Sequence, residues 1–299
     1  MKKNILRTCA LTAALILGLT ACGGSEKAET KKADAESPVS TEGEETAAGG
    51  ETTASREEVT VRIGLTGAIY EEIWNPIAEE LKDEGINIEL VQFSDFSLPN
   101  AALASGDIEM NAFQHHAYFE NEVETKGYDI SAIGDTFVIA MNLYSDKISD
   151  VSELKDGDTI AIPGDASNGG RALKLLESAG IIKLKDDAGA NPEVSDIETY
   201  NVQVEFIEAD ASNIYSMLPD VTAAVINGNY ALDCGIDPQE DGIFFEKEYD
   251  DDSYFCLIAV RSEDKDDPVY QRIVEAFQSE STKQVFQDVF KGFFVPAWE

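Results

Sequence analysis

Residues 59–93 read VTVRIGLTGAIYEEIWNPIAEELKDEGINIELVQF. The start of this stretch alternates between apolar and polar side chains, as a half-buried strand does. Ile73, Ile77 and Leu81 then follow at the spacing of one helical face, and Gly85 marks the end of that helix. The alternation returns at the end of the stretch. A strand, a helix and a second strand in this order predict a parallel sheet, because parallel strands need a crossover connection that a helix usually supplies.

The same order of elements recurs along the rest of the chain. Further strands are predicted at 108–113, 159–165, 202–209, 223–232 and 253–264, and further helices at 116–127, 170–182, 213–219 and 268–290. We expect two α/β lobes, the first formed by residues 59–136 and 231–299 and the second by residues 137–230. A chain that passes twice between two lobes leaves a cleft, and such a cleft is a common place for a small ligand.

The N-terminal segment predicts export and attachment to a membrane. Basic residues precede a short apolar run, which is typical of a signal peptide and is too short for a membrane span. The run ends in LTAC, which resembles a bacterial lipobox. Residues 1–22 are therefore predicted to be a lipoprotein signal peptide, with Cys22 acylated, for example by palmitate, and anchored at the extracytoplasmic face of the cell membrane. An ordinary signal peptide that contains a cysteine is the alternative.

The segment after the signal peptide is predicted to be a disordered acidic tether. Residues 23–58 contain one valine and no other large apolar side chain, so they cannot bury enough surface to offset the entropy of ordering. The whole chain has 58 acidic and 22 basic residues and a formal net charge of -36. This charge argues against nucleic acid and other polyanions as partners.

Two cysteines, Cys234 and Cys256, lie in the predicted globular part. An exported domain permits a disulfide between them, and two free thiols are the alternative. The sequence has no visible internal repeat, and we expect a monomer.

Both histidines of the chain, His115 and His116, lie in the stretch NAFQHHAYFE at residues 111–120. Adjacent side chains point in different directions on a strand or a helix, so these two imidazoles cannot converge on one metal ion. The pair also lacks the i, i+4 spacing of a zinc-binding helix. The sequence therefore predicts no metal site and no cofactor. A structural role, in which one histidine caps or packs and the other is solvated, is one alternative to a role in binding.

The aromatic residues around the histidines predict a binding slot. A strand that passes into a helix would direct Phe113, His115 and Tyr118 toward one point beyond the carboxyl end of the strand. Ligands bind at that edge in open α/β sheets. Phe96, in the loop after another predicted strand, belongs to the same edge. These rings would form an apolar pocket.

A second candidate is the stretch IPGDASNGGRALKLL at residues 162–176, which predicts a strand, a short polar loop and a helix near Arg171. It lacks the Lys-Ser/Thr ending of a phosphate loop. Backbone N–H groups at the helix start, together with the Arg171 guanidinium, could hold a carboxylate. A surface salt bridge of Arg171 is the alternative.

Three stretches, at residues 111–120, 134–186 and 223–231, are similar to the NlpA family of lipoproteins, the methionine-binding components of bacterial ABC importers. The resemblance extends from about residue 59 to the C-terminal PAW. It implies a type II periplasmic-binding-protein fold, with two α/β lobes joined by two crossover strands and an amino acid in the cleft. It further implies a lipid-anchored receptor that delivers methionine or a close relative to an ABC permease and its ATPase.

The resemblance also implies roles for individual residues. Phe113, His115 and Tyr118 match the aromatic pocket of the family, Arg171 matches the arginine that binds the ligand carboxylate, and Asn227 matches an asparagine that helps to hold the α-amino group.

Two positions depart from the family pattern. Phe96 stands where a tyrosine is common, and Cys256 stands where an asparagine that contacts the polar end of the ligand is common. A thiol is a weak hydrogen-bonding group, and a buried ammonium short of a partner costs about 1–3 kcal/mol. Another amino acid, a methionine dipeptide or another small ligand therefore stays open as the alternative to methionine.

Two other classes of protein are alternatives to the receptor. An exported hydrolase would need Ser167 as nucleophile with His115 or His116 as base, but the G-x-S-x-G elbow is absent. A surface adhesin or metal scavenger, with an incidental cleft, is the third class. We expect a binding protein without catalytic residues, not an enzyme.

Overall fold

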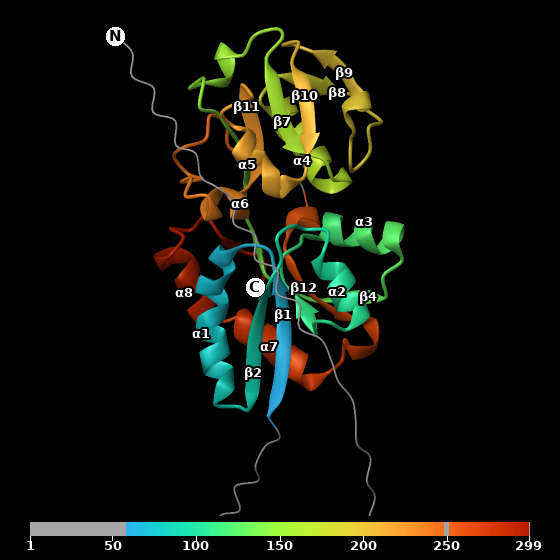
Figure 1. The fold of residues 1–299 in the computed structure, drawn as a ribbon, viewed down its shortest axis with the longest axis vertical. Helices are drawn as coiled ribbons and strands as arrows, with labels where there is room; N and C mark the ends of the chain where they lie inside the picture. The colour runs from blue at the N-terminus through green and yellow to red at the C-terminus, as the bar shows by residue number, and fades with distance from the viewer. Residues whose placement is uncertain (1–57, 248–250, 299) are drawn as a thin grey trace, which may run out of the picture. The chain divides into compact units, whose positions relative to one another are not determined.

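The computed structural model describes residues 58–247 and 251–298 (Figure 1). The predicted signal peptide, Cys22 and the predicted tether up to residue 57 lie outside the described residues. Within the part that is described, no helix is long and apolar enough to cross a membrane.

The first sheet has five strands in the order β2-β1-β3-β12-β4. Their bounds are β1 Val59–Leu65, β2 Ile86–Gln92, β3 Met110–Asn111, β4 Ile130–Asp135 and β12 Leu257–Arg261. β1 pairs in parallel with β2 and β3, as predicted from the opening stretch, whereas β12 runs antiparallel to β3 and β4. The C-terminal part of the chain therefore completes the first sheet, and β1 and β2 lie side by side next to α1 in Figure 1.

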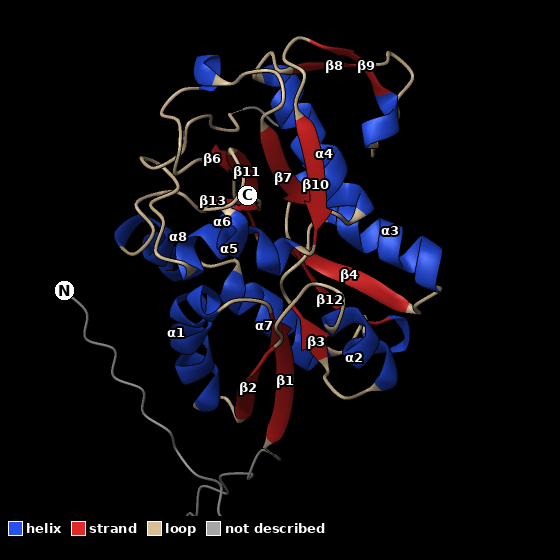
Figure 2. Cartoon of the chain, turned by 45° about the horizontal axis from the view of Figure 1, so that its top comes forward, coloured by secondary structure: helices blue, strands red, loops and turns tan. Residues whose placement is uncertain are grey.

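Helices cover both faces of this sheet. They are α1 Glu71–Lys82, α7 Pro268–Phe277 and α8 Glu280–Asp288 on one face, and α2 Pro99–Ser105 and α3 His116–Lys126 on the other. Along β12, Ile258 and Val260 pack toward α1 and α7, and Leu257 and Ala259 pack toward α2. This period of two is expected of a strand buried on both sides. Figure 2 shows α2 beside β3, away from α1.

The second sheet has four strands in the order β10-β7-β11-β6. Their bounds are β6 Met141–Tyr144, β7 Thr159–Pro163, β10 Glu205–Ala209 and β11 Ala223–Asn227. Helix α4, Ala166–Ser178, packs on one face, and the short helices α5, Ile214–Met217, and α6, Gly228–Asp233, pack on the other. Two small pairs complete the structure, β8 Ile182–Leu184 with β9 Ile197–Tyr200 and β5 Phe137–Val138 with β13 Val295–Pro296.

The chain passes between the two sheets twice. The first passage runs from β4 through β5 to β6. After α6 the chain stays beside the second sheet, where Phe244 pairs with Leu143, and it returns to the first sheet between Glu246 and Cys256. The sequence-based bounds assigned residues 231–299 to the first lobe, including the segment 231–246 that lies beside the second sheet, and these bounds remain a prediction. The α/β fold itself is confirmed.

Three predicted elements differ at their ends, two of them because of local capping. The helix expected at 268–290 is two helices, since the Ser279 side chain accepts a hydrogen bond from the Thr282 N–H and starts α8. The apolar stripe continues through both, which hid the break. Likewise α4 begins at Ala166 instead of residue 170, because the Asp165 side chain caps its first turn. The buried strand expected at 223–232 ends at Asn227, where α6 begins.

Candidate ligand-binding site

Four aromatic rings form one cluster at the ends of the strands. The ring centroid of Phe96 lies 5.9 Å from Phe113, 6.1 Å from Tyr118 and 4.9 Å from Tyr230. The Tyr118 hydroxyl donates to the backbone carbonyl of Phe96 at 2.9 Å, which fixes the loop that carries Phe96. The structure thus brings together the three predicted aromatic residues. Tyr230, which sequence reasoning missed, lies three residues after Asn227.

His115 joins the two halves of the site. It caps α3, with its Nδ1 accepting from the Tyr118 backbone N–H at 3.1 Å, and its Nε2 lies 3.2 Å from Oδ1 of Asn168 on α4. Burial, and next the positive charge of Arg171, lower the pKa of His115 to about 3. The imidazole is therefore neutral near pH 7, and both of its nitrogens are engaged by protein groups.

Cys256 is buried with its side chain at the same cavity. Its backbone N–H donates to Phe137 at 2.7 Å, and burial raises the pKa of its thiol to about 12. Cys234 is exposed, and both cysteines are free, so the structure favours the alternative of two thiols. Among the residues that the structure describes, no group of three His, Cys, Asp or Glu side chains could hold a metal ion.

Six of the seven predicted site residues line one cavity: Phe96, Phe113, His115, Tyr118, Asn227 and Cys256. Its wall also includes Tyr70, Ile139 and Asn168, which sequence reasoning did not identify. The cavity volume is about 30 Å³, which is room for about two water molecules. A larger ligand therefore requires the rings or the two sheets to move apart.

Arg171, the seventh predicted residue, does not line this cavity. Its Nε donates to Glu246 Oε1 at 2.8 Å and its Nη2 to Glu246 Oε2 at 2.6 Å, and Nη2 also donates to the Ile139 carbonyl. The Tyr254 ring lies 4.4 Å from the guanidinium carbon. The two charged side chains are only 5% and 10% exposed, so the salt bridge is buried and not at the surface.

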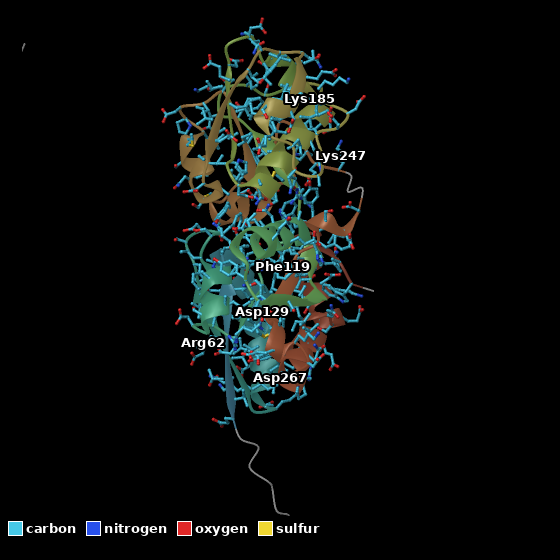
Figure 3. The ribbon with its side chains drawn as sticks, turned by 90° about the vertical axis from the view of Figure 1, so that its right-hand side faces the viewer. Arg62, Phe119, Asp129, Lys185, Lys247 and Asp267 are labelled. Atoms are coloured by element: carbon cyan, nitrogen blue, oxygen red, sulfur yellow. The ribbon has the colours of Figure 1, made fainter. Side chains whose placement is uncertain are left out.

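Glu246 was missed because it lies 75 residues from Arg171 in a segment without a recognisable pattern. Its carboxylate also accepts from the Met141 backbone N–H at 2.9 Å, and its own N–H donates to Asn142. It thereby ties the guanidinium to the start of β6. Arg171, Glu246 and Tyr254 line a neighbouring cavity of about 500 Å³, together with Lys247, which is labelled in Figure 3.

Asn227 ends β11 and presents its side chain to the aromatic cavity. Its Nδ2 donates to Asn168 Oδ1 at 2.8 Å. Although the residue is only 7% exposed, its Oδ1 has no hydrogen-bond partner among the described residues. A buried carbonyl oxygen without a partner costs free energy, so this atom indicates a ligand that donates a hydrogen bond.

The two α/β halves, the two passages of the chain between them and the polar and aromatic cavity define the type II periplasmic-binding-protein class. The chain belongs to the NlpA lipoprotein family, whose model matches residues 61–298.

Individual relatives agree with this membership. The chain is 42% identical over 251 residues to outer membrane lipoprotein 2 of Mannheimia haemolytica, covering 83% of this chain and 90% of the relative. It is 37% identical over 241 residues to the D-methionine-binding lipoprotein MetQ of Escherichia coli K12, covering 80% and 88%. A solved nutrient-binding protein from Burkholderia cenocepacia bound to methionine is 38% identical, covers 80% of this chain and 100% of its own, and has a TM-score of 0.76.

Proposed function

We propose that this protein is a lipid-anchored receptor that binds methionine or a close relative in the aromatic cavity and delivers it to an ABC permease and its ATPase. The observation that carries the proposal is the buried Asn227 Oδ1, which has no partner among the described residues and lies at a ring-lined cavity. The names of the relatives, which include methionine-binding lipoproteins and a methionine-bound structure, support the choice of ligand.

The side chain of methionine suits the rings of the cavity. A thioether in contact with an aromatic ring gains about 0.3–1.5 kcal/mol, and Phe96, Phe113 and Tyr118 offer several such contacts. At the other end, the ammonium would donate to Asn227 Oδ1, which supplies the missing partner for that oxygen. Apolar contacts and one charge-assisted hydrogen bond thus act at opposite ends of the ligand.

Arg171 remains the proposed partner of the ligand carboxylate, although Glu246 already binds one edge of its guanidinium. The Nε and Nη2 edge of the guanidinium, which would bind a carboxylate in two parallel hydrogen bonds, is held by Glu246. A ligand carboxylate would therefore have to displace Glu246 to bind this edge of the guanidinium. Movement of Glu246 would also loosen the start of β6, through its bond to Met141.

The anchor is proposed to be an acyl chain on Cys22, at the extracytoplasmic face of the cell membrane. Relatives of similar length are named as lipoproteins, which supports attachment to a membrane. The tether at residues 23–58 would then let the folded part reach the permease.

The chain is a binding protein and not an enzyme. Ser167 Oγ donates to the Asp165 carboxylate at 3.0 Å, and the two nitrogens of His115 face Tyr118 and Asn168. Ser167 and His115 are therefore held by other groups and do not form a hydrolytic pair, and the family consists of substrate-binding lipoproteins.

Calorimetric titration tests the ligand. The full chain, purified in detergent, is unfolded and refolded to remove ligand carried through purification, and is then titrated with L-methionine, D-methionine and methionine-containing dipeptides. We expect micromolar or tighter binding of at least one of them. No binding of any of the three would refute the ligand assignment while leaving the family membership intact.

A further inference from the structure

Asp165 holds the side chain of Asn168 in one orientation. Both oxygens of the Asp165 carboxylate accept from Asn168 Nδ2, each at 3.0 Å, and Oδ1 also accepts from the Asn168 backbone N–H at 2.9 Å. An ionised carboxylate can only accept hydrogen bonds. The amide nitrogen of Asn168 must therefore face Asp165, and its carbonyl oxygen must point the other way.

His115 gives an independent check on this orientation. The Tyr118 backbone N–H is a donor, so the His115 Nδ1 that it contacts must be the unprotonated nitrogen. The neutral ring then carries its proton on Nε2 and needs an acceptor there. The atom of Asn168 that it meets, at 3.2 Å, is Oδ1. Two fixed groups, a carboxylate and a backbone N–H, thus lead to the same orientation, although amide and imidazole orientations are usually ambiguous.

The orientation of Asn168 in turn determines that of Asn227. Asn168 Oδ1 can only accept, so the Asn227 atom at 2.8 Å from it must be the amide nitrogen. The Asn227 carbonyl oxygen is thereby left without a partner at the cavity. Asn168 is 2% exposed and Asn227 is 7% exposed, so water cannot easily exchange with either amide.

We propose that Asp165 is a positioning residue that acts through Asn168 to present the Asn227 carbonyl oxygen, and not its amide nitrogen, to the ligand. The site then requires a hydrogen-bond donor from the ligand and selects an α-ammonium group. This inference rests on the proposed function for the identity of the ligand, but the orientation of the three side chains does not depend on it.

The Asp165→Asn variant removes the carboxylate that orients the Asn168 amide but keeps a side chain that can cap α4. Asparagine is as good an N-cap as aspartate, so α4 should form normally. The new amide keeps its oxygen for the Asn168 backbone N–H and turns its NH₂ group toward the NH₂ group of Asn168. This contact weakens the preference of Asn168 for its wild-type orientation, which the oxygen of the new amide and the protonated Nε2 of His115 still favour. In the fraction of molecules in which Asn168 reverses, Asn227 reverses with it, which places a donor opposite the ligand ammonium.

The test compares methionine with its desamino analogue, 4-(methylsulfanyl)butanoate, by calorimetry on the full chain. In Asp165→Asn, we expect about a threefold loss of affinity for methionine, because the reversed orientation is only partly populated, and little change for the analogue, which has no ammonium. In an Asn227→Ala background, Asp165→Asn should cause no further loss. Asp267→Asn is the matched control and should change neither affinity. Asp267 caps α7, which packs on the first sheet, and it is labelled in Figure 3.

Equal losses for both ligands, or a loss in Asp165→Asn that persists in the Asn227→Ala background, would overturn the proposal. A readout without ligand separates it from the proposed function. The side-chain amide NMR signals of Asn168 and Asn227 should shift in Asp165→Asn, and His115 should be protonated at Nε2 in the wild type. If no compound binds to the wild type, the proposed function fails, and unchanged amide signals would then refute the positioning role by themselves.

Discussion

Replacing Glu246 with glutamine should have opposite effects on stability and on ligand affinity. In the folded protein, Glu246 Oε2 accepts from both Met141 N–H and Arg171 Nη2, whereas Oε1 accepts from Arg171 Nε. Glutamine keeps one oxygen, best placed at the Oε2 position, and turns an NH₂ group toward Arg171 Nε. One charge-assisted hydrogen bond is lost, and the buried guanidinium loses the negative charge of Glu246.

The expected cost follows from this geometry. Removing one member of a buried ion pair costs about 3–5 kcal/mol, and the hydrogen bonds that glutamine retains reduce this to about 2–4 kcal/mol. The free energy of unfolding, measured by urea titration without ligand, should fall by that amount in Glu246→Gln. Glu109→Gln is the matched control, because Glu109 binds Arg62 with the same two-point geometry but with side chains 39% and 19% exposed. The control should lose no more than about 1 kcal/mol.

The affinity for methionine should rise in the same variant. In the wild type the ligand carboxylate would compete with Glu246 for the Nε and Nη2 edge of Arg171, and Glu246→Gln removes this competitor. We expect about tenfold tighter binding, which corresponds to the recovery of one charge-assisted hydrogen bond. A variant that loses stability and also loses affinity would refute competition, and would mean that Glu246 only orients Arg171.

Three further predictions concern the cavity and its thiols. Cys256→Asn should raise the affinity for methionine about tenfold by restoring a hydrogen-bonding group, with Cys256→Ala as the control that shows no gain in calorimetry. His115 is buried and neutral with a pKa of about 3, against 6.5 for an unperturbed imidazole, so only the unfolded state gains this proton as the pH falls from 6.5 toward 3. Stability should therefore fall by up to about 1.4 kcal/mol per pH unit over that range, and urea titrations should show this contribution missing in His115→Asn, which retains a capping acceptor. A thiol reagent should modify the exposed Cys234 in the folded protein and the buried Cys256 only after unfolding. Mass spectrometry of peptides would identify the modified cysteine, and modification of Cys256 before Cys234 would contradict the burial of Cys256 at the cavity.

The fold could be predicted from periodicity because strands such as β7, β11 and β12 are buried and helices such as α1, α4 and α7 are amphipathic. The opening stretch contains its own evidence for a parallel pair, and β1 and β2 pair as expected. The ends of helices were harder to predict from the sequence, since they depend on single capping residues. Ser279 interrupts an apolar stripe that continues from Phe277 to Phe286, and hydrophobic spacing alone does not reveal such a break.

The site residues also differ in how well the sequence predicts them. Phe113, His115 and Tyr118 are close in sequence, so the passage from strand to helix is enough to bring them together. The partners of Arg171 and Asn227 come from distant parts of the chain, and side-chain type does not reveal them. Among the residues that were missed, Asn168 was the one that the sequence could best have predicted. Asp165, three residues before it, is a recognisable helix cap that accepts from the Asn168 backbone N–H.

The two polar ends of an amino acid meet different conditions in this site. At Arg171, an internal carboxylate already satisfies the guanidinium edge, so a ligand carboxylate exchanges one ion pair for another and gains little. At Asn227, the carbonyl oxygen has no partner among the described residues, so an ammonium adds a hydrogen bond without breaking one. We infer that the binding free energy of the polar end comes mainly from the ammonium. The carboxylate would chiefly determine whether Glu246, and with it the start of β6, is released.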